Sequence, residues 1–233
     1  MISILGNNYN DTNDIKKILL KKYKNKEFDD CGNVSIINAS FIADKSYIIR
    51  KPNEDYIKRE LKWYLSESLN VKDIPGNIPQ IWLNIADKNG YINSNYGWTT
   101  FSKENHEQFK SVVNELKKNK FSRQGVIIFI RPTMHQDSKL NGRHDFICTY
   151  CYNFKIENNT LYMIVNMRSN DCVFGYNNDF AFADYVFDKM LYELKDYNLK
   201  KGVIFWNADN FHVYPRHFKY LEELENDYEN KIN

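Results

Sequence analysis

Residues 146–155 alternate between two sets of side chains, and this alternation restricts the possible folds more than any other feature of the sequence. One set, mostly aromatic, takes every second position: Phe146, Cys148, Tyr150, Tyr152 and Phe154. A period of two residues is typical of a β-strand, whose successive side chains point to opposite faces. Glu157-Asn158-Asn159 then resembles a turn, and residues 160–168 are again strand-like. We therefore expect two strands joined by a short turn.

Helices and strands are mixed along the rest of the chain. Apolar residues at helical spacing predict helices at residues 12–23, 54–68, 105–118 and 180–197. Segments rich in β-branched and aromatic residues predict strands at residues 33–38, 41–50, 125–131, 145–155, 160–168 and 202–207. Because this order is not a regular β-α alternation, it favours an α+β fold, a mixed β-sheet with helices packed on it, over a doubly wound parallel sheet.

The composition indicates a single domain spanning residues 1–233, since the sequence contains no linker, repeat or low-complexity tract. The net charge of +2 argues against a polybasic arm that binds nucleic acid. The longest apolar runs, residues 126–130 and 161–165, are far shorter than the ~20 residues that cross a bilayer. The polar N-terminus does not resemble a secretion signal. We therefore expect a cytoplasmic protein that requires neither a membrane nor a nucleic acid.

The cysteines are too few and too scattered for a disulfide framework, at positions 31, 148, 151 and 172. Cys148 and Cys151 form a C-x-x-C pair, a spacing that also occurs in zinc sites and redox proteins. Residues three apart on a strand face opposite ways, so one ion cannot bind both thiols. We expect free thiols and no metal site.

Two polar groups adjoin apolar segments. Arg168, Ser169 and Asp171 follow a predicted strand, where they can bind an anion and a polar heterocycle. The alternative is a surface salt bridge at the strand end. Glu60 shares a face of its predicted helix with aromatic residues, where a carboxyl group would have a raised pKa and could transfer protons. The alternative is a residue at the helix edge that faces solvent.

Several short motifs resemble those of the thymidylate synthases, in the same order and spacing. They are Glu60-Leu61-Lys62-Trp63-Tyr64, Ile81-Trp82, Asn95-Tyr96-Gly97, Cys148 five residues before Asn153-Phe154, Arg168-Ser169-Asn170-Asp171 with Gly175 and Asn178, and His212-Val213-Tyr214. The resemblance covers about residues 33–220. Within that superfamily the chain is most similar to the phage deoxycytidylate 5-hydroxymethylases, notably in residues 59–75, 92–98 and 166–179.

The resemblance implies a thymidylate synthase-like fold, a homodimer formed through the sheet, and a folate-dependent one-carbon transferase. Cys148 matches the thiolate that adds to C6 of the pyrimidine nucleotide and makes C5 nucleophilic. The cosubstrate would be 5,10-methylenetetrahydrofolate. Addition of water would convert dCMP into 5-hydroxymethyl-dCMP and release tetrahydrofolate. Glu60 would transfer protons and order that water, and the cation of Arg168 would raise the thiolate fraction of Cys148.

The same resemblance implies the binding residues. Arg168 and Ser169 match contacts to the 5′-phosphate, and His212 and Tyr214 match contacts to the sugar hydroxyl. The other matches are Tyr96 and Asp171 for the substrate, Trp82 and again Asp171 for the folate, and Arg123 for the phosphate held by the neighbouring subunit.

The departures from the thymidylate synthase pattern concern the base and the phosphate. Asp179 stands where those enzymes have an asparagine, and a carboxyl group pairs with the amino edge of cytosine. Alternatively, Asp179 is an ordinary helix N-cap. Thr149 replaces a histidine after the nucleophile, as in the hydroxymethylase branch, and Gln124 replaces a phosphate-binding arginine. The second change is expected to weaken nucleotide binding.

The same residues are compatible with other functions. The same fold could serve a CMP or dUMP hydroxymethylase or a thymidylate synthase. A catalytically silent member could bind nucleic acid or a partner through its many Tyr and Phe residues. The resemblance also suggests host cytoplasm as the setting and a larger assembly of nucleotide-synthesis enzymes as a partner. The charged tail, residues 222–233, is expected to be frayed.

Overall fold

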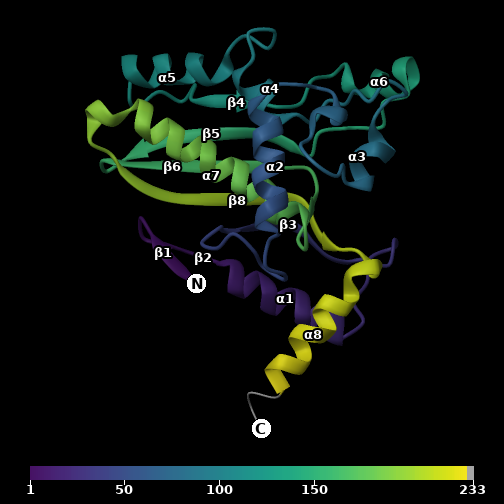
Figure 1. Cartoon of the computed structure of the whole chain (residues 1–233). Helices are drawn as coiled ribbons and strands as arrows, with labels where there is room; N and C mark the ends of the chain where they lie inside the picture. Colours follow the sequence, from purple (N-terminus) through teal and green to yellow (C-terminus); the bar gives the residue numbers. More distant parts are fainter. Residues whose placement is uncertain (230–233) are drawn as a thin grey trace.

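The computed structural model describes residues 1–229 of the chain. Its centre is a mixed β-sheet (Figure 1). The strands lie in the order β3 (Val34–Ile42), β8 (Lys200–Val213), β6 (Thr160–Met167), β5 (Thr149–Glu157) and β4 (Val126–Ile128). The short strand β7 (Asn170–Asp171) pairs with β8. The pairs β6–β8 and β7–β8 are parallel and the others are antiparallel, so the expected α+β fold with a mixed sheet is confirmed.

Helices α2 (Glu54–Leu65) and α7 (Gly175–Glu193) cross one face of the sheet, with α4 (Tyr96–Phe101) beside α2 (Figure 1). The core between these helices and the strands contains large buried rings: Trp63, Tyr152, Tyr176, Phe182, Phe187 and Trp206. The helix α5 (Gln108–Lys118) packs near the edge strand β4. The side chains of the candidate site come from α2, α3 (Gln80–Ile85), α4, α7, the strand ends and the connection between α5 and β4.

The alternation of β6 buries every second residue on the helix-covered side. On the opposite face, side chains from the four strands β3, β8, β6 and β5 form a row of hydrogen bonds. The Ser40 hydroxyl donates to Asn207, the Asn207 amide donates to Asn166, and the Asn166 amide donates to the Cys151 sulfur. This face is therefore held in one register by polar side chains.

The first and last described helices, α1 (Thr12–Lys24) and α8 (Phe218–Glu229), lie together at one side of the sheet (Figure 1). A hairpin of β1 (Ile2–Ile4) and β2 (Asn7–Tyr9) precedes α1. Asp11 caps α1 by accepting from the backbone amides of Asn13 and Asp14. The remaining short elements are α6 (Met134–Asn141) and the 3-10 turns η1 (Val71–Asp73), η2 (Lys195–Tyr197) and η3 (Pro215–His217).

Several predicted elements need correction. The two strands expected at residues 33–38 and 41–50 are one strand, β3, and residues 43–53 are irregular although Ile48 and Ile49 are buried. The helix expected from residue 180 begins at Gly175, and the strand expected at 202–207 is the longer β8. Helices α3, α4, α6 and α8 were not predicted. The tail is helical to Glu229, and residues 230–233 of that prediction lie outside the described residues.

Across residues 1–229, none of the helices has the length and apolar character needed to span a bilayer.

Candidate active site

Glu60 lies in the interior of α2 and is only 3% exposed, so its interpretation as a solvent-facing residue is wrong. The Tyr56 hydroxyl, one helical turn earlier, donates to Glu60 Oε1 at 2.6 Å. The Trp82 indole nitrogen on α3 donates to the Tyr56 oxygen at 2.8 Å. Burial raises the pKa of Glu60 to about 7, although these hydrogen bonds oppose the shift. A carboxyl group in this state can both give and take a proton near neutral pH.

Asp179 is the fifth residue of α7, whose N-cap is Phe174, so the alternative that Asp179 caps this helix is wrong. Its Oδ2 accepts a hydrogen bond of 2.7 Å from the Asn170 amide, and Asn170 Oδ1 accepts from the Trp206 indole at 3.2 Å. Burial, followed by the charge of Glu60, raises the pKa of Asp179 to about 8. The side chain is therefore mostly a neutral acid at pH 7, able to donate and accept.

Cys148 directly precedes β5, and its sulfur lies 3.6 Å from Nη2 of Arg168. The Arg168 guanidinium also donates to the carbonyl oxygens of Phe146 and Ile147 and lies over the Phe146 ring. Among the described residues Arg168 pairs with no carboxylate, so the interpretation as a surface salt bridge is not supported. Arg168 lowers the pKa of Cys148 as expected, but burial outweighs it and raises this pKa to about 11. Arg168 therefore acts in the expected direction and raises the thiolate fraction, but burial still keeps most of the thiol protonated at neutral pH.

Tyr96 begins α4 and stacks on Tyr64 of α2, with ring centroids 5.5 Å apart. Its hydroxyl accepts a hydrogen bond of 3.0 Å from Thr149, the residue that departs from the family histidine. Burial and, as a smaller contribution, the negative charge of Asp179 raise the pKa values of both Tyr96 and Cys148. Tyr96, Asp179 and Cys148 thus form one electrostatic cluster, which Glu60 joins through its effect on Asp179.

Gly97 explains why α2 and α4 come so close. A Cβ atom at this position would lie 1.8 Å from the Tyr64 carbonyl oxygen. Only glycine therefore allows the approach that places Tyr96 against Tyr64.

Asp171 and His212 are register partners in the β7–β8 pair, and the His212 and Tyr214 rings are 4.5 Å apart. His212 is 5% exposed, and neither ring nitrogen has a hydrogen-bond partner within residues 1–229. Burial lowers the pKa of His212, so the ring is neutral at pH 7. A buried neutral imidazole with two unpaired nitrogens is available to a polar group of a ligand. His217 was missed by sequence reasoning; its Nδ1 lies 3.8 Å from Asp171 Oδ1.

Ser169 follows Arg168 at the end of β6. Arg123 and Gln124 lie in the connection between α5 and β4, and both are exposed. No hydrogen bond or ion pair joins the Arg123 side chain to any part of the described chain. The structure of one chain therefore leaves Arg123 apart from the cluster around Cys148.

Sequence reasoning also missed a polar network beside the nucleophile. Asn93 is 1% exposed; its amide donates to Asp137 and to the Asp145 carbonyl, and its oxygen accepts from Arg131 and Arg143. The Asp145 carboxylate in turn accepts from the backbone amides of residues 93 and 94. Since Asp145 lies three residues before Cys148, this network holds the loop that carries the thiol. Asn93 lies just before the motif Asn95-Tyr96-Gly97, but no sequence pattern marks Asn93 itself as the centre of a polar network.

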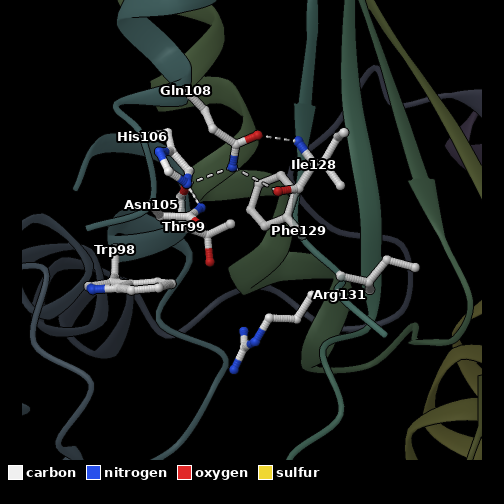
Figure 2. A pocket seen from close by; sticks show the side chains of 9 residues that line it. Trp98, Thr99, Asn105, His106, Gln108, Ile128, Phe129 and Arg131 are labelled. Carbon is white, nitrogen blue, oxygen red and sulfur yellow. Dashed lines mark hydrogen bonds between the residues drawn. The ribbon is translucent and has the colours of Figure 1, made fainter. Parts of the chain in front are cut away.

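A pocket of about 280 Å³ lies between α4, the start of α5 and the end of β4 (Figure 2). The Gln108 amide donates to the carbonyl oxygens of Thr99 and Ile128 and accepts from the Ile128 amide, which satisfies the open edge of β4. The described lining includes none of the predicted site residues; it consists of Trp98, Thr99, Asn105, His106, Gln108, Ile128, Phe129, Ile130 and Arg131.

The chain is similar to several known proteins. A deoxycytidylate 5-hydroxymethyltransferase of Enterobacteria phage T4 is 45% identical over 203 residues, covering 84% of this chain and 82% of the relative. The protein of that name from phage T2 is 43% identical over 217 residues, covering 90% and 88%. Thermostable thymidylate synthase A of Bacillus subtilis has a similar fold, with a TM-score of 0.61 at 22% identity, covering 81% of this chain and 69% of that one. The family model described as thymidylate synthase matches residues 12–231. The chain therefore belongs to the thymidylate synthase family.

Proposed function

We propose that this enzyme transfers a one-carbon unit from 5,10-methylenetetrahydrofolate to C5 of dCMP with addition of water, giving 5-hydroxymethyl-dCMP and tetrahydrofolate. One observation carries the choice of base: Asp179, a carboxyl group at the position of the family asparagine, lies in one cluster with Glu60, Tyr96 and Cys148. With a pKa of about 8, its carboxyl group can donate to N3 of cytosine when protonated and accept from the N4 amino group. The names of the T2 and T4 relatives support the same substrate.

Cys148 is the proposed nucleophile. Its thiolate would bond to C6 of the pyrimidine, so that C5 becomes the carbon nucleophile, and would leave again when the product forms. With a pKa near 11 the thiol must lose its proton during the reaction, and the nearby Arg168 favours the anion. Glu60 would order the water that adds to the exocyclic methylene group on C5 and would take up its proton.

The folate supplies a one-carbon unit at the oxidation level of formaldehyde. The residues near α3 fit such a planar, partly apolar molecule: Trp82 is half-buried, and its neighbours Ile81 and Leu83 are 57% and 48% exposed. Trp82 would hold the ring system by stacking. Asp171 would accept hydrogen bonds from it.

The nucleotide would lie between the strand ends. Arg168 retains Nη1 for the 5′-phosphate, because Nε and Nη2 donate to carbonyl oxygens, and Ser169 adjoins it. His212 and Tyr214 would bind the sugar hydroxyl. The free, exposed Arg123 supports a homodimer through the sheet in which it reaches the phosphate of the other subunit. We also propose that the chain forms a single domain and acts in the cytoplasm.

The direct test is to incubate the enzyme with methylenetetrahydrofolate and either dCMP, CMP or dUMP, and to identify the product by mass spectrometry. We expect hydroxymethylated dCMP as the main product. A methylated product, or turnover of dUMP alone, would show a thymidylate synthase activity. Absence of any turnover, together with tight binding of a nucleic acid, would show a silent member of the family.

A further inference from the structure

Tyr56 connects two side chains of the proposed site. Tyr56 and Glu60 lie one turn apart on α2, and Trp82 lies on α3. The two hydrogen bonds, 2.8 Å from the indole nitrogen to the tyrosine oxygen and 2.6 Å from that oxygen to Glu60 Oε1, form a continuous chain. Neither the motifs nor the proposed mechanism gives Tyr56 a role.

The chemistry of the groups fixes the direction of this chain. An indole nitrogen can only donate, so the tyrosine oxygen is the acceptor from Trp82. The single proton of the Tyr56 hydroxyl must then point to Oε1 of Glu60. Burial keeps the pKa of Tyr56 well above its ordinary value, so this proton stays on the tyrosine.

The position of the Tyr56 ring is also fixed. The Arg59 guanidinium lies 5.4 Å from the centre of the ring. Arg59 is itself held by Asp55 and by the carbonyl oxygens of Pro75 and Asn77, at distances of 2.9–3.0 Å. The loop that leads to α3 is thereby tied to α2. The hydroxyl group of Tyr56 is therefore kept on Oε1.

We propose that Tyr56 is a positioning residue that reserves Oε1 of Glu60 as an acceptor, so that any proton exchanged by Glu60 is carried on Oε2. One carboxyl oxygen is then permanently structural and the other is the working one. Only the destination of the proton rests on the proposed function: the proton would pass between Oε2 of Glu60 and the water that adds to the nucleotide. The geometry of the three side chains stands without it.

Removing the Tyr56 hydroxyl should change the titration of Glu60. The groups facing this carboxyl are Tyr56 and Tyr64 from α2, Trp82 from α3 and Asp179 from α7, with Arg59 acting on Tyr56. A donor to a carboxylate stabilises the charged form, so its loss raises the pKa. With Glu60 starting near 7, we expect an upward shift of about one to two units in Tyr56→Phe.

The test measures Glu60 directly by infrared titration of its carboxyl band, assigned with Glu60→Gln, in the full-length enzyme. Tyr197→Phe is the matched control, since its hydroxyl bonds an exposed carbonyl oxygen of Lys117 far from α2. We expect the band to titrate higher in Tyr56→Phe and unchanged in the control. The acid-side limb of the pH–rate profile should move by the same amount. A titration point that stays in place or moves down would overturn the proposal.

A second measurement needs no variant that might misfold. In the unmodified enzyme, we expect the Tyr56 hydroxyl proton as a slowly exchanging downfield proton resonance that persists on both sides of the Glu60 titration. Its disappearance when Glu60 is protonated would mean that Oε1 itself takes up the proton, against the proposal. The infrared titration and the proton resonance are both independent of turnover. An enzyme inactive toward dCMP but with the Glu60 shift would therefore refute only the proposed function.

Discussion

The Cys148 sulfur lies 3.6 Å from the Arg168 guanidinium, and yet its pKa is raised to about 11. One cation does not compensate for the removal of the thiol from water and for the negative charges of Asp179 and Asp145 nearby. The thiol is thus kept in its unreactive form until another group changes this balance.

The balance between burial and the Arg168 cation should control how fast the Cys148 thiol reacts. Alkylation of Cys148 by iodoacetamide requires the thiolate, so its rate should rise about tenfold per pH unit from pH 7 towards pH 10. Arg168→Gln removes the cation that lowers the thiol pKa, and should slow alkylation at pH 8 by about tenfold. Peptide mass spectrometry at Cys148 measures the rate. Lys110→Gln, an exposed change on α5, should leave it unchanged, and equal rates in all three proteins would contradict the prediction.

Cys148→Ala should reduce turnover to below about a thousandth of the original, because no other thiol can form the bond to C6. Cys31→Ser is the matched control, since Cys31 is exposed and lies outside the site. Product formation with both variants is measured at saturating nucleotide and folate. Retained activity in Cys148→Ala would rule out the covalent mechanism.

The half-buried acid at Asp179 should make the free energy of unfolding depend on pH. Its folded pKa of about 8 exceeds the ordinary value of 3.8, so between these values the folded state binds more protons than the unfolded state. The free energy of unfolding should therefore fall as the pH rises from 5 to 8. Asp179→Asn keeps an acceptor for Asn170 but cannot ionise. Denaturant unfolding should show this variant more stable than the original by about 1–3 kcal/mol at pH 8 and nearly equal at pH 4. An identical slope with pH in both proteins would contradict the prediction.

The network centred on Asn93 should be important for stability. Asn93→Ala leaves Asp137, Arg131 and Arg143 without a shared buried partner, at a cost of about 2–4 kcal/mol in the free energy of unfolding. Asn114→Ala, on the exposed face of α5, should cost less than about 0.5 kcal/mol. Urea unfolding compares the two, and a similar small cost for both would show that the network is dispensable.

Arg123 allows a test of the shared site. If Arg123 serves the neighbouring subunit, Cys148→Ala and Arg123→Ala proteins should each be weakly active, and their mixture should recover about a quarter of the original activity. This follows because half of the dimers are mixed and each mixed dimer has one intact site. Activity after joint refolding measures the recovery. Lys118→Ala, a nearby exposed change, should need no partner to be active. No recovery in mixtures that form dimers would place Arg123 outside the site.

The strands β5 and β6 were predictable because their burial alternates along the sequence, throughout β6 and from Cys151 onward in β5. The same rule failed at residues 43–50. These residues include β-branched and aromatic side chains and contribute Ile48 and Ile49 to the core. Beyond the Ala43 amide, which donates to the Ile204 carbonyl oxygen of β8, they form no strand. Apolar composition predicts burial, whereas strand pairing also needs a partner, which the local sequence does not specify.

The start of α7 shows a similar limit. Gly175 and the asparagines that follow it have a low helix propensity, so the sequence predicts a helix only from residue 180. In the structure α7 begins at Gly175, and Tyr176 and Asn177 are buried. Tertiary packing overrides the propensity, and this moves Asp179 from a helix cap to a half-buried position inside α7, where it accepts from Asn170.

The sequence by itself determined which reactive groups the chain carries and, through motif order and periodicity, the class of fold. Only the tertiary structure decided the state of those groups. The pKa values of Cys148, Glu60 and Asp179 depend on burial and on hydrogen bonds with residues from other segments, such as Trp82 and Asn170. Because desolvation and hydrogen bonding act between segments brought together by folding, no local pattern in the sequence encodes them.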